Sequence, residues 1–519
     1  MKKIFPFYIT AVLLLAAGCS GKLDIQNPNT PTITNFWKTE QDALAGVNTL
    51  YSTYHRVGLC RNQFFITIIR SDEGYSTSPN PTLVNNFDKF IITDYNLFET
   101  RSLWQDCFIG INRANQILDN VPAIQMDEKL KQQYLGEAKF MRALFYFYLA
   151  QYWGNVPLQL KTPQPDDHPA TSPQAAVWAQ VEKDLTEAAP ALPITYSDRD
   201  KGRATRGAAH ALLGKAFMQE RKYQEAATAL QWFFTGEGNG IYTLMTNYRD
   251  NFVITSENNA ESVFEFQFAV NPTDNHDDDT DPNNTDNLNY GSSLPPFFAP
   301  RPIGFTDGQA RRWVVNEYMT ERTATNARDP RLAASFLYDS TDERGPDFSL
   351  VYGKTFSSLG YSSDPSAVPN THDVYLRKML NDFRDDVESF HSGNNYRYIR
   401  FADVLLLYAE ALNATGQTAA AYPFVDRVRE RAGLQKLSVV KPGLSQAAFL
   451  AQLKHERITE LAGEGHRWED LARWGDLGPQ LAGRDPGFAN FQTGKHELLP
   501  IPQQDVDVNP NLVQNPGWK

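Results

Sequence analysis

The stretch LLGKAFMQERKYQEAATAL, from Leu212 to Leu230, has the pattern of two short helices joined at the polar pair Arg221–Lys222. Small and large side chains recur at helical spacing on both sides of this turn, namely Leu213, Gly214, Phe217, Tyr223, Ala226 and Leu230. Small residues let two helices approach closely, and large residues fill the groove between them. The stretch therefore predicts an antiparallel helix pair with packed inner faces.

A second, looser copy of this pattern occurs much later in the chain, at Leu405, Ala409, Leu412, Ala421 and Val425, with Gly416 at the turn. Two further helical segments, Val177 to Ala189 and Leu450 to Trp474, could complete other pairs. The spacing is typical of the tetratricopeptide repeat, in which each helix pair buries a face against its neighbour. Copies so far apart predict a helical scaffold interrupted by long insertions.

Three more segments have the apolar spacing of helices: Phe36 to Tyr54, Leu103 to Asp119, and Glu137 to Trp153. The last, EAKFMRALFYFYLAQYW, is apolar on nearly every face after its first turn, and such a helix is buried on all sides. Its aromatic residues could form a ligand platform, but their helical spacing favours core packing. The helix is expected to end at Gly154–Asn155.

The insertions between these helices differ in character. Ser71 to Thr100 is rich in Asn, Pro, Asp and Tyr and is expected to form a long loop. Within Asn251 to Ala269, the alternation of ESVFEFQF predicts a strand. Asn271 to Gly304 is a loop crowded with Asp and Asn, and Tyr338 to Asp373 is expected to contain short strands. Long loops on a rigid scaffold commonly carry binding residues.

The composition allows a large core, with 519 residues of which 41% are hydrophobic. At about 100–200 residues per domain, this length predicts two to four domains, or one large domain with insertions because no low-complexity linker divides the chain. The formal charge of -12 argues against a nucleic-acid partner, whose phosphates need a basic surface. Aromatic residues make up 12% of the chain, with 23 Tyr and 32 Phe, and a chain rich in Tyr and Asn suits polar, ring-shaped ligands.

Residues 1–18 are expected to be a lipoprotein signal peptide. Lys2 and Lys3 precede an apolar stretch, Ile4 to Ala17, that is too short to span a bilayer. The small residues AAG before Cys19 resemble a bacterial lipobox, so cleavage would leave Cys19 to be acylated and anchored in the membrane. The alternative is an ordinary secretory signal with an incidental Cys. No later stretch is apolar enough to be expected to cross a membrane.

Two other cysteines, Cys60 and Cys107, lie in semi-apolar sequence with helical character. The exported compartment permits a disulfide between them. Two buried free thiols are an equally open interpretation, because a sequence does not show the Cα separation that a bridge requires.

Specific catalytic and metal motifs do not occur in the sequence, which lacks a GxSxG elbow, a Walker loop and an HExxH pair. With 61 acidic residues, the carboxylate pair of a glycoside hydrolase stays an alternative. Alternating oxygens of a calcium loop occur at Asp277, Asp279, Asp281 and Asn283. Pro282 and Leu288 replace the Gly and Glu of such a loop, which favours an ordinary solvated loop. We therefore expect no metal, no cofactor and no enzymatic activity.

The segment HERITELAGEGHRWEDLARW, from His455 to Trp474, concentrates charged and aromatic residues. Gly463 and Gly465 allow a break between two helices that carry Glu456, Glu460, Arg467 and Arg473. This grouping could be catalytic, but paired Arg and Glu near a core more often hold helices together. The structural interpretation is favoured.

The tail LLPIPQQDVDVNPNLVQNPGW, from Leu498 to Trp518, lacks the period of a helix or a strand. Its prolines fix φ and remove hydrogen-bond donors, so the segment cannot stabilise itself. Its apolar residues favour lying on the rest of the protein, and they are Leu499, Ile501, Val506, Leu512, Val513 and Trp518. We expect an ordered strap with Ile501, Val506 and Leu512 as anchors.

Several of these segments together resemble the SusD/RagB family of outer-membrane nutrient-binding lipoproteins. The matching segments are the lipobox, EAKFMRALFYFYLAQYWGNVPL (Glu137 to Leu158), GRATRGAAHALLGKAFM (Gly202 to Met218), YIRFADVLLLYAEALN (Tyr398 to Asn413), HERITELAGEGHRWEDLARWG and the tail. They occur in family order and span nearly the whole mature chain.

The resemblance implies a mostly α, SusD-like fold with four tetratricopeptide-like helix pairs and loop-rich insertions. It implies an N-terminal part of about 19–235 and a C-terminal part of about 250–519. It also implies a lipoprotein on the outer face of the outer membrane, anchored at Cys19, that acts as a hinged lid over a SusC-like TonB-dependent transporter. The expected ligand is an oligosaccharide, with a peptide as the alternative.

The matched motifs belong to the scaffold, so candidate ligand contacts are chosen from the loops on chemical grounds. Sugars present flat CH faces and rims of hydroxyls, which aromatic rings and polar side chains can satisfy. From Ser71 to Trp104 we select Asp72, Tyr75, Asn85, Tyr95 and Arg101. From Asn283 to Trp313 we select Asn289, Tyr290, Phe298 and Arg301.

Overall fold

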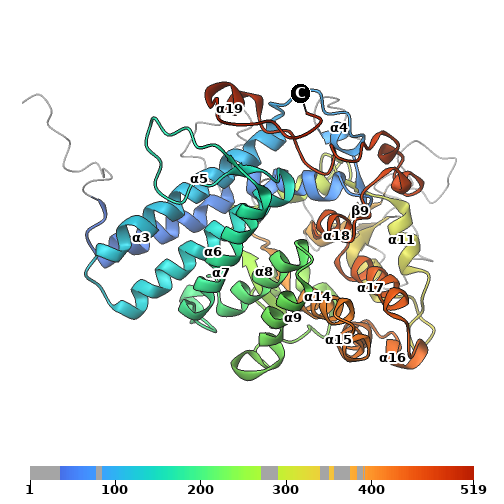
Figure 1. The fold of residues 1–519 in the computed structure, drawn as a ribbon. Helices are drawn as coiled ribbons and strands as arrows, with labels where there is room; N and C mark the ends of the chain where they lie inside the picture. Colours follow the sequence, from blue (N-terminus) through green and yellow to red (C-terminus); the bar gives the residue numbers. More distant parts are fainter. Residues whose placement is uncertain are drawn as a thin grey trace, which may run out of the picture.

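Helix α6 (Glu128–Tyr152) lies at the centre of the fold, and every side chain from Phe140 to Tyr152 is buried. The computed structural model describes residues 36–76, 84–270, 290–338, 350–355, 374–382, 390 and 392–518. Helices α5 (Phe98–Asn120) and α7 (Gln174–Ala191) pack against α6 (Figure 1). A Cβ added at Gly110 of α5 would lie 2.2 Å from the Phe145 ring, so the crossing of α5 and α6 requires glycine. The predicted helix buried on all sides is confirmed.

The other long helices continue this packing as an antiparallel stack (Figure 1). They are α3 (Glu40–Ser52), α8 (Arg206–Gln219), α9 (Tyr223–Leu230), α14 (Phe401–Ala414), α15 (Thr418–Arg431), α17 (Gln446–Leu461) and α18 (Arg467–Trp474), and the single turn α16 (Leu437–Val440) follows α15. Helix α8 packs on α7, α9 packs on α8, and α14 packs on α9. The long segment between α9 and α14 is therefore an insertion that leaves the stack continuous.

Both predicted repeat pairs are confirmed, as α8–α9 and α14–α15. A Cβ at Gly214 would lie 2.4 Å from the Leu230 side chain, which shows that the small residue permits the close approach of α8 and α9. Gly416, in the turn between α14 and α15, has φ +80°, a left-handed conformation that glycine adopts without strain.

The strands are short, and among the described residues they form two-stranded antiparallel sheets. The pairs are β1 (Gly74–Tyr75) with β5 (Gln309–Ala310), β2 (Val156–Pro157) with β3 (Thr171–Ser172), β4 (Ser262–Phe266) with β10 (Tyr396–Arg400), β6 (Phe336–Leu337) with β9 (Tyr375–Leu376), and β7 (Leu350–Val351) with β8 (Lys354–Thr355). Strand β4 confirms the prediction from ESVFEFQF, and β7 and β8 confirm short strands after Tyr338.

Short helices lie in the insertions and the tail: α4 (Val84–Asp88), α10 (Leu294–Phe298), α11 (Arg312–Tyr318), α12 (Pro330–Ser335) and α19 (Gln503–Val508). The segment Ser71 to Thr100 therefore has more regular secondary structure than expected, because it contains β1, α4 and the start of α5. Helix α6 also begins before the expected Glu137, since the Asp127 carboxylate accepts a hydrogen bond from the Leu130 amide and caps an earlier turn.

The C-terminal tail is an ordered strap across the end of α6 (Figure 1). Leu499, Ile501 and Leu512 are buried, and Val506 is half-buried, as expected of anchors. The expectation for Val513 was wrong, because 69% of this residue is exposed. The expectation of no helix was also wrong, because Gln503–Val508 forms the short helix α19, with Pro502 at its N-cap.

Cys60 and Cys107 are both buried free thiols, which decides between the two open alternatives. Burial raises the pKa of the Cys60 thiol to about 12, so it stays protonated and unreactive. The predicted signal segment, Cys19, the Asp277–Asn283 loop and Asn289 lie outside the described residues. Within the described ranges, no helix has both the length and the apolar character needed to cross a membrane.

Candidate ligand-binding face

The two loops selected from the sequence meet in the structure. Strands β1 and β5 pair antiparallel, with Gly74 opposite Ala310 and Tyr75 opposite Gln309. The Arg311 amide donates to the Glu73 carbonyl over 2.7 Å. These contacts create one surface from residues 72–76 and 297–313, which we call the paired-loop face.

An aromatic cluster of Phe297, Phe305 and Phe390 lies at the paired-loop face. Phe305 is 43% exposed, and its ring centroid lies 5.3 Å from that of Phe297 and 5.8 Å from that of Phe390. The Arg61 guanidinium lies 4.5 Å from the Phe297 centroid on the inner side of the cluster. A large aromatic ring is thus presented to solvent while its neighbours hold it in place.

A second aromatic element is Tyr75, whose ring lies 4.3 Å from the guanidinium carbon of Arg311. Two carboxylates hold Arg311 in this position: Asp485 at 2.9 Å and Asp88 at 2.7 Å. Burial and the neighbouring charge of Asp485 raise the pKa of Asp88 to about 8, against the opposing effect of Arg311. Two acidic groups around one guanidinium therefore retain a proton near neutral pH.

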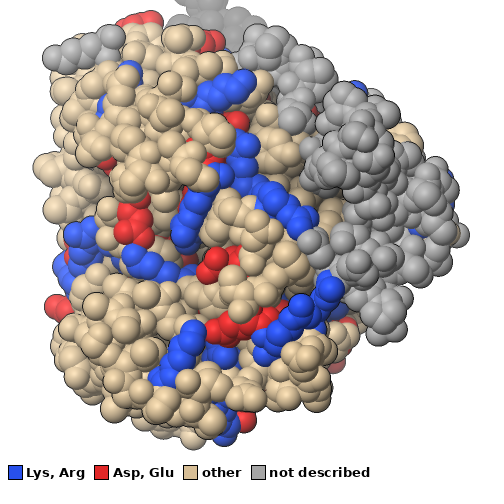
Figure 2. Space-filling model, turned by 90° about the vertical axis from the view of Figure 1, so that its right-hand side faces the viewer, with Lys and Arg blue, Asp and Glu red and all other residues tan. Residues whose placement is uncertain are grey.

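A third aromatic element is Trp313, which is half-buried and lies 4.3 Å from the Arg484 guanidinium. Its indole nitrogen donates to the backbone carbonyl of Asp72. The face around α11 carries a band of Lys and Arg side chains with Asp and Glu between them (Figure 2). The charges on this side of the protein are therefore mixed rather than of one sign.

The structure places the selected residues of the first loop in different environments. Asp72 is fully buried, and its carboxylate accepts hydrogen bonds of 2.6 and 2.9 Å from Arg467 and one of 3.1 Å from Arg484. Its oxygens are therefore engaged within the protein. Tyr75 lies at the paired-loop face and Asn85 lies half-buried in α4. Tyr95 and Arg101 lie instead near the tail, with the Tyr95 ring 5.8 Å from that of Trp518.

The selected residues of the second loop also lie in different environments. Arg301 is exposed at the paired-loop face, and its Nε donates to the Phe305 carbonyl at 3.3 Å. Tyr290 is 54% exposed and lies beside His55, with ring centroids 5.9 Å apart. Phe298 has no exposed surface and packs 6.0 Å from the Phe65 ring, so it belongs to the core.

Sequence reasoning missed Phe297, Phe305, Arg311, Trp313 and Arg484 as members of this face. The doublet Phe297–Phe298 was a signal, but only a backbone shows which ring points outward. No sequence pattern indicated that Arg484 belongs to this face, because it contacts Trp313 from a segment that is distant in sequence.

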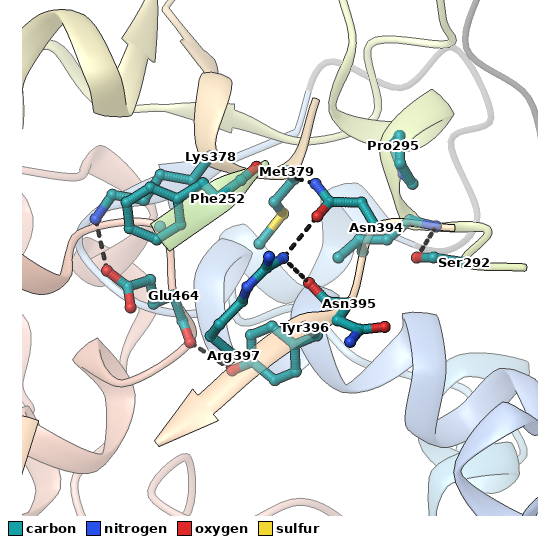
Figure 3. Close-up of a pocket in the computed structure, with 12 residues that line it drawn as sticks. Phe252, Ser292, Pro295, Lys378, Met379, Asn394, Asn395, Tyr396, Arg397 and Glu464 are labelled. Atoms are coloured by element: carbon teal, nitrogen blue, oxygen red, sulfur yellow. Dashed lines mark hydrogen bonds and ion pairs between the residues drawn. The ribbon is translucent and has the colours of Figure 1, made fainter. Parts of the chain in front are cut away.

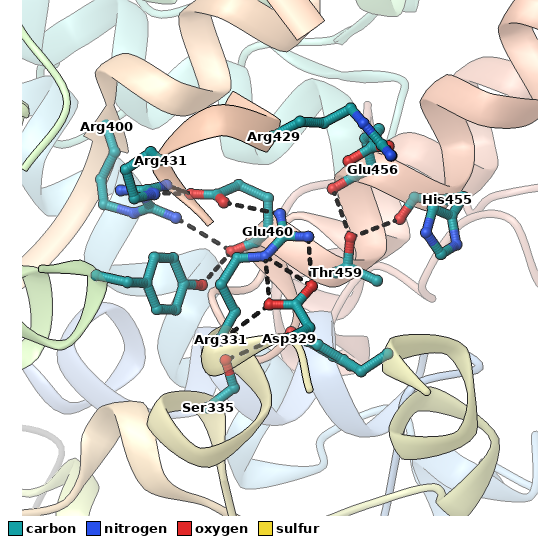
Figure 4. Close-up of polar contacts among 12 residues, drawn as sticks. Asp329, Arg331, Ser335, Arg400, Arg429, Arg431, His455, Glu456, Thr459 and Glu460 are labelled. Carbon is teal, nitrogen blue, oxygen red and sulfur yellow. Dashed lines mark hydrogen bonds and ion pairs between the residues drawn. The ribbon is translucent and has the colours of Figure 1, made fainter. Parts of the chain in front are cut away.

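A buried ion-pair network lies within the scaffold beneath the loops (Figure 4). The Glu460 carboxylate lies 3.0 Å from Arg400 and 3.2 Å from Arg331, and it also pairs with Arg431. Burial alone would raise the pKa of Glu460, but these guanidinium groups outweigh it and hold the pKa at about 2. The observed pairing supports the structural interpretation of the segment from His455 to Trp474.

A second charged group in this region consists of Glu321, His455 and Glu456, whose possible ligand atoms lie within 4.8 Å of one another. Arg429 bonds Glu321 at 2.7 Å and also pairs with Glu456, while Lys441 lies 3.1 Å from Glu321. The positive charge that a metal ion would supply there already comes from Arg429 and Lys441. We therefore interpret this group as an ion-pair network.

A small internal cavity of about 40 Å³ lies between β10 and the 292–295 segment (Figure 3). Arg397 donates to Asn394 at 2.6 Å across it, and Lys378 pairs with Glu464 at 2.7 Å. Ligand pockets usually have volumes of about 300–1,000 Å³. This cavity is therefore too small for a sugar.

The helical stack and its loops define a class of protein: a helical-repeat scaffold that displays long loop-rich insertions. A sequence model described as "SusD family" matches residues 234–518, and another described as "Starch-binding associating with outer membrane" matches residues 68–218. The first match covers more than half of the 519 residues, so the chain belongs to the SusD family. The second description associates the family with the outer membrane.

Individual relatives agree with this assignment. SusD-like protein P25 of Formosa agariphila is 28% identical over 427 residues, which cover 79% of this chain and 78% of that protein. A SusD superfamily structure from Bacteroides vulgatus has a TM-score of 0.79 at 26% identity and covers 93% of this chain and 100% of that one. The structure of a laminarin-binding SusD-like protein has a TM-score of 0.75 at 28% identity, with coverage of 93% and 100%. The predicted family and the mostly α fold are thus confirmed, while the division near residue 240 stays a prediction.

Proposed function

We propose that this protein binds neutral oligosaccharides at the paired-loop face, without changing them chemically. The observation that carries the proposal is the exposed ring of Phe305, which Phe297 and Phe390 hold in place. A fixed aromatic ring offers the flat apolar surface on which the CH face of a sugar packs. Exposed Arg301 lies next to this ring and supplies donors for sugar hydroxyls.

Two of the comparisons, one with a solved structure and one with a family model, support a glycan rather than a peptide as ligand. One similar structure, 28% identical to this chain, is described as laminarin-binding. The description of the family model that matches residues 68–218 names starch. Both laminarin and starch are neutral glucans, and side chains of both charges lie on the side of the protein around α11 (Figure 2).

The proposed place of action is the outer face of the outer membrane, with the chain anchored through acylated Cys19. There it would act as a lid that delivers oligosaccharides to a SusC-like TonB-dependent transporter. This part of the proposal is supported by the lipobox-like sequence before Cys19 and by membership of the SusD family. The ligand would bind to the exposed face and be released inward when the lid closes.

A binding panel tests the ligand class. The chain from Ser20 onward retains every described element, since the first described residue is Phe36. We expect calorimetry of this protein to show heat of binding with laminarin oligosaccharides or maltooligosaccharides, and chromatography to show that the sugars stay intact. Binding of a peptide pool with no response to any glycan would overturn the ligand assignment, and shortening of the sugars would favour the glycoside hydrolase alternative.

A further inference from the structure

A large groove lies away from the paired-loop face, between the outer side of α5, the 157–169 segment and α19 of the tail. Its volume is about 730 Å³, within the range of about 300–1,000 Å³ that ligand sites occupy. The tail therefore does more than cover the end of α6, because α19 and the residues after it form one wall of this groove.

The floor of the groove is aromatic and apolar. Trp104 and Phe108 lie one turn apart on α5, with ring centroids separated by 4.9 Å. Trp104 is almost fully buried, whereas Phe108 is half-buried and lines the groove. Leu512 of the tail completes the apolar part of the lining.

Several polar groups at the groove have hydrogen-bonding capacity that the described part of the protein does not use. Among the described residues, the Arg101 guanidinium and the Gln105 amide, both lining the groove, have no side-chain hydrogen-bond partner. One carboxyl oxygen of Asp505, Oδ2, is buried and also lacks a partner. Buried polar atoms in folded proteins usually have a partner, so this oxygen is available to a ligand hydroxyl.

The charges that line the groove indicate a neutral ligand. Arg56 is neutralised by its ion pair with buried Asp106. The positive charge of Arg101 is balanced by the carboxyl groups of Asp167 and Asp505, which also line the groove. The groove therefore has no excess positive charge to attract a phosphate or a uronate. A wholly apolar ligand is equally disfavoured, because it would leave these polar groups without partners.

We propose that this groove is a second oligosaccharide-binding site, separate from the paired-loop face. A short neutral chain packs a CH face on Phe108, while its hydroxyl rim bonds to Arg101, Gln105 and Asp505. The inference deepens the proposed function, because it assigns the same ligand class to a second site. Two sites on one protein retain a polymer more strongly than either alone when one chain can span both.

Hydrogen exchange and calorimetry with laminarihexaose and maltoheptaose, using the chain from Ser20, test this inference. We expect one of these sugars to protect amides in two separate regions, Phe297–Phe305 and Trp104–Asn112, with a stoichiometry above one. Arg101→Ala should weaken the second site about tenfold or more, the loss expected for a hydrogen bond to a charged group of about 1.5–3 kcal/mol. Phe108→Ala should weaken it as well, and Phe305→Ala should leave it unchanged.

The matched control is Lys139→Ala, a half-buried surface residue outside both sites, and melting temperatures check that all variants fold. Protection confined to the paired-loop face, with no effect of Arg101→Ala, would overturn the second site and leave the proposed function intact. If neither glucan bound in either region, both proposals would fail.

Discussion

The indole Nε1 of Trp153 donates a hydrogen bond of 2.9 Å to the carbonyl oxygen of Pro500, joining the end of α6 to the tail. Two further bonds lie beside it: the Leu499 amide donates to the Tyr152 carbonyl at 2.7 Å, and Asn515 Nδ2 donates to the Trp153 carbonyl at 2.8 Å. The last carbonyl groups of a helix have no partner within the helix. The tail supplies those partners for α6, the central helix of the fold.

Removing the Trp153–Pro500 bond should therefore destabilise the whole protein. Trp153→Phe leaves a buried carbonyl without a donor, and we expect it to lower the free energy of unfolding by about 1–3 kcal/mol. Deleting residues 499–519 should have a larger effect and lower the melting temperature clearly. Val513→Ala is the matched control in the same segment, because this side chain is exposed. Equal urea midpoints for Trp153→Phe and Val513→Ala would contradict the role of the strap.

Glu460 should be among the most sensitive positions in the scaffold. Glu460→Gln removes the negative charge shared by Arg331, Arg400 and Arg431, and breaking a buried pair in this way costs about 3–5 kcal/mol. Glu128→Gln is the control, because the Glu128 side chain is 69% exposed and its ion pair with Lys131 lies at the surface. Urea unfolding of the two variants measures the difference. A Glu460→Gln protein as stable as the control would show that the network is energetically neutral.

The carboxyl pair around Arg311 should make stability depend on pH. The pKa of Asp88 is about 8 in the folded protein and near its ordinary value of 3.8 in the unfolded chain. The folded state thus binds more protons between these values, and its stability falls as the pH rises through that window. Asp88→Asn imitates the protonated carboxyl and should remove this part of the loss.

Urea midpoints at a pH of about 5 and of about 9 measure the effect in the wild type and in Asp88→Asn. The wild type should lose more stability than the variant between these two conditions. Asp198→Asn serves as the control, because its exposed carboxyl already pairs with Lys201 and is not part of the cluster. Parallel curves for the wild type and Asp88→Asn would show that Asp88 is ionised throughout.

Lipidation of Cys19 should determine whether the protein is attached to the membrane. Cys19→Ala removes the thiol that the predicted lipidation requires, so we expect the protein to leave the detergent-soluble membrane fraction. Acyl chains contribute about 0.8 kcal/mol for each buried methylene, and no other anchor is expected from the sequence. Cell fractionation and metabolic labelling with a fatty acid analogue measure the change. If Cys19→Ala carried no fatty acid label but stayed attached to the membrane, the proposed anchor at Cys19 would be contradicted.

The scaffold was predictable because its signals are local. In α6, α8–α9 and α14–α15 the apolar and small residues recur at helical spacing, and a few turns of sequence show the pattern. The exact start of α6 was missed because the cap comes from Asp127, outside the apolar run. Helix α19 was missed because only six residues form it, and the scaffold rather than its own sequence holds it in place.

The environments of the candidate binding residues were harder to predict because they depend on partners that are distant in sequence. Asp72 was selected as a ligand contact, yet its carboxylate is bound by Arg467, which follows 395 residues later. Phe297 and Phe298 are neighbours, but the turn of α10 directs one toward the surface cluster and the other into the core. Loop composition indicates the region of a candidate site. Whether each side chain faces solvent or the core depends on the folded backbone.

The most direct test of the proposed glycan binding is calorimetry with Phe305→Ala. With the glucan that the wild type binds most strongly, we expect this variant to lose about tenfold or more in affinity at the paired-loop face, because it removes the exposed ring on which the sugar packs. Ile241→Ala, another exposed apolar side chain, should bind as the wild type does. Unchanged affinity of a folded Phe305→Ala protein would contradict the assignment of the paired-loop face as the ligand site.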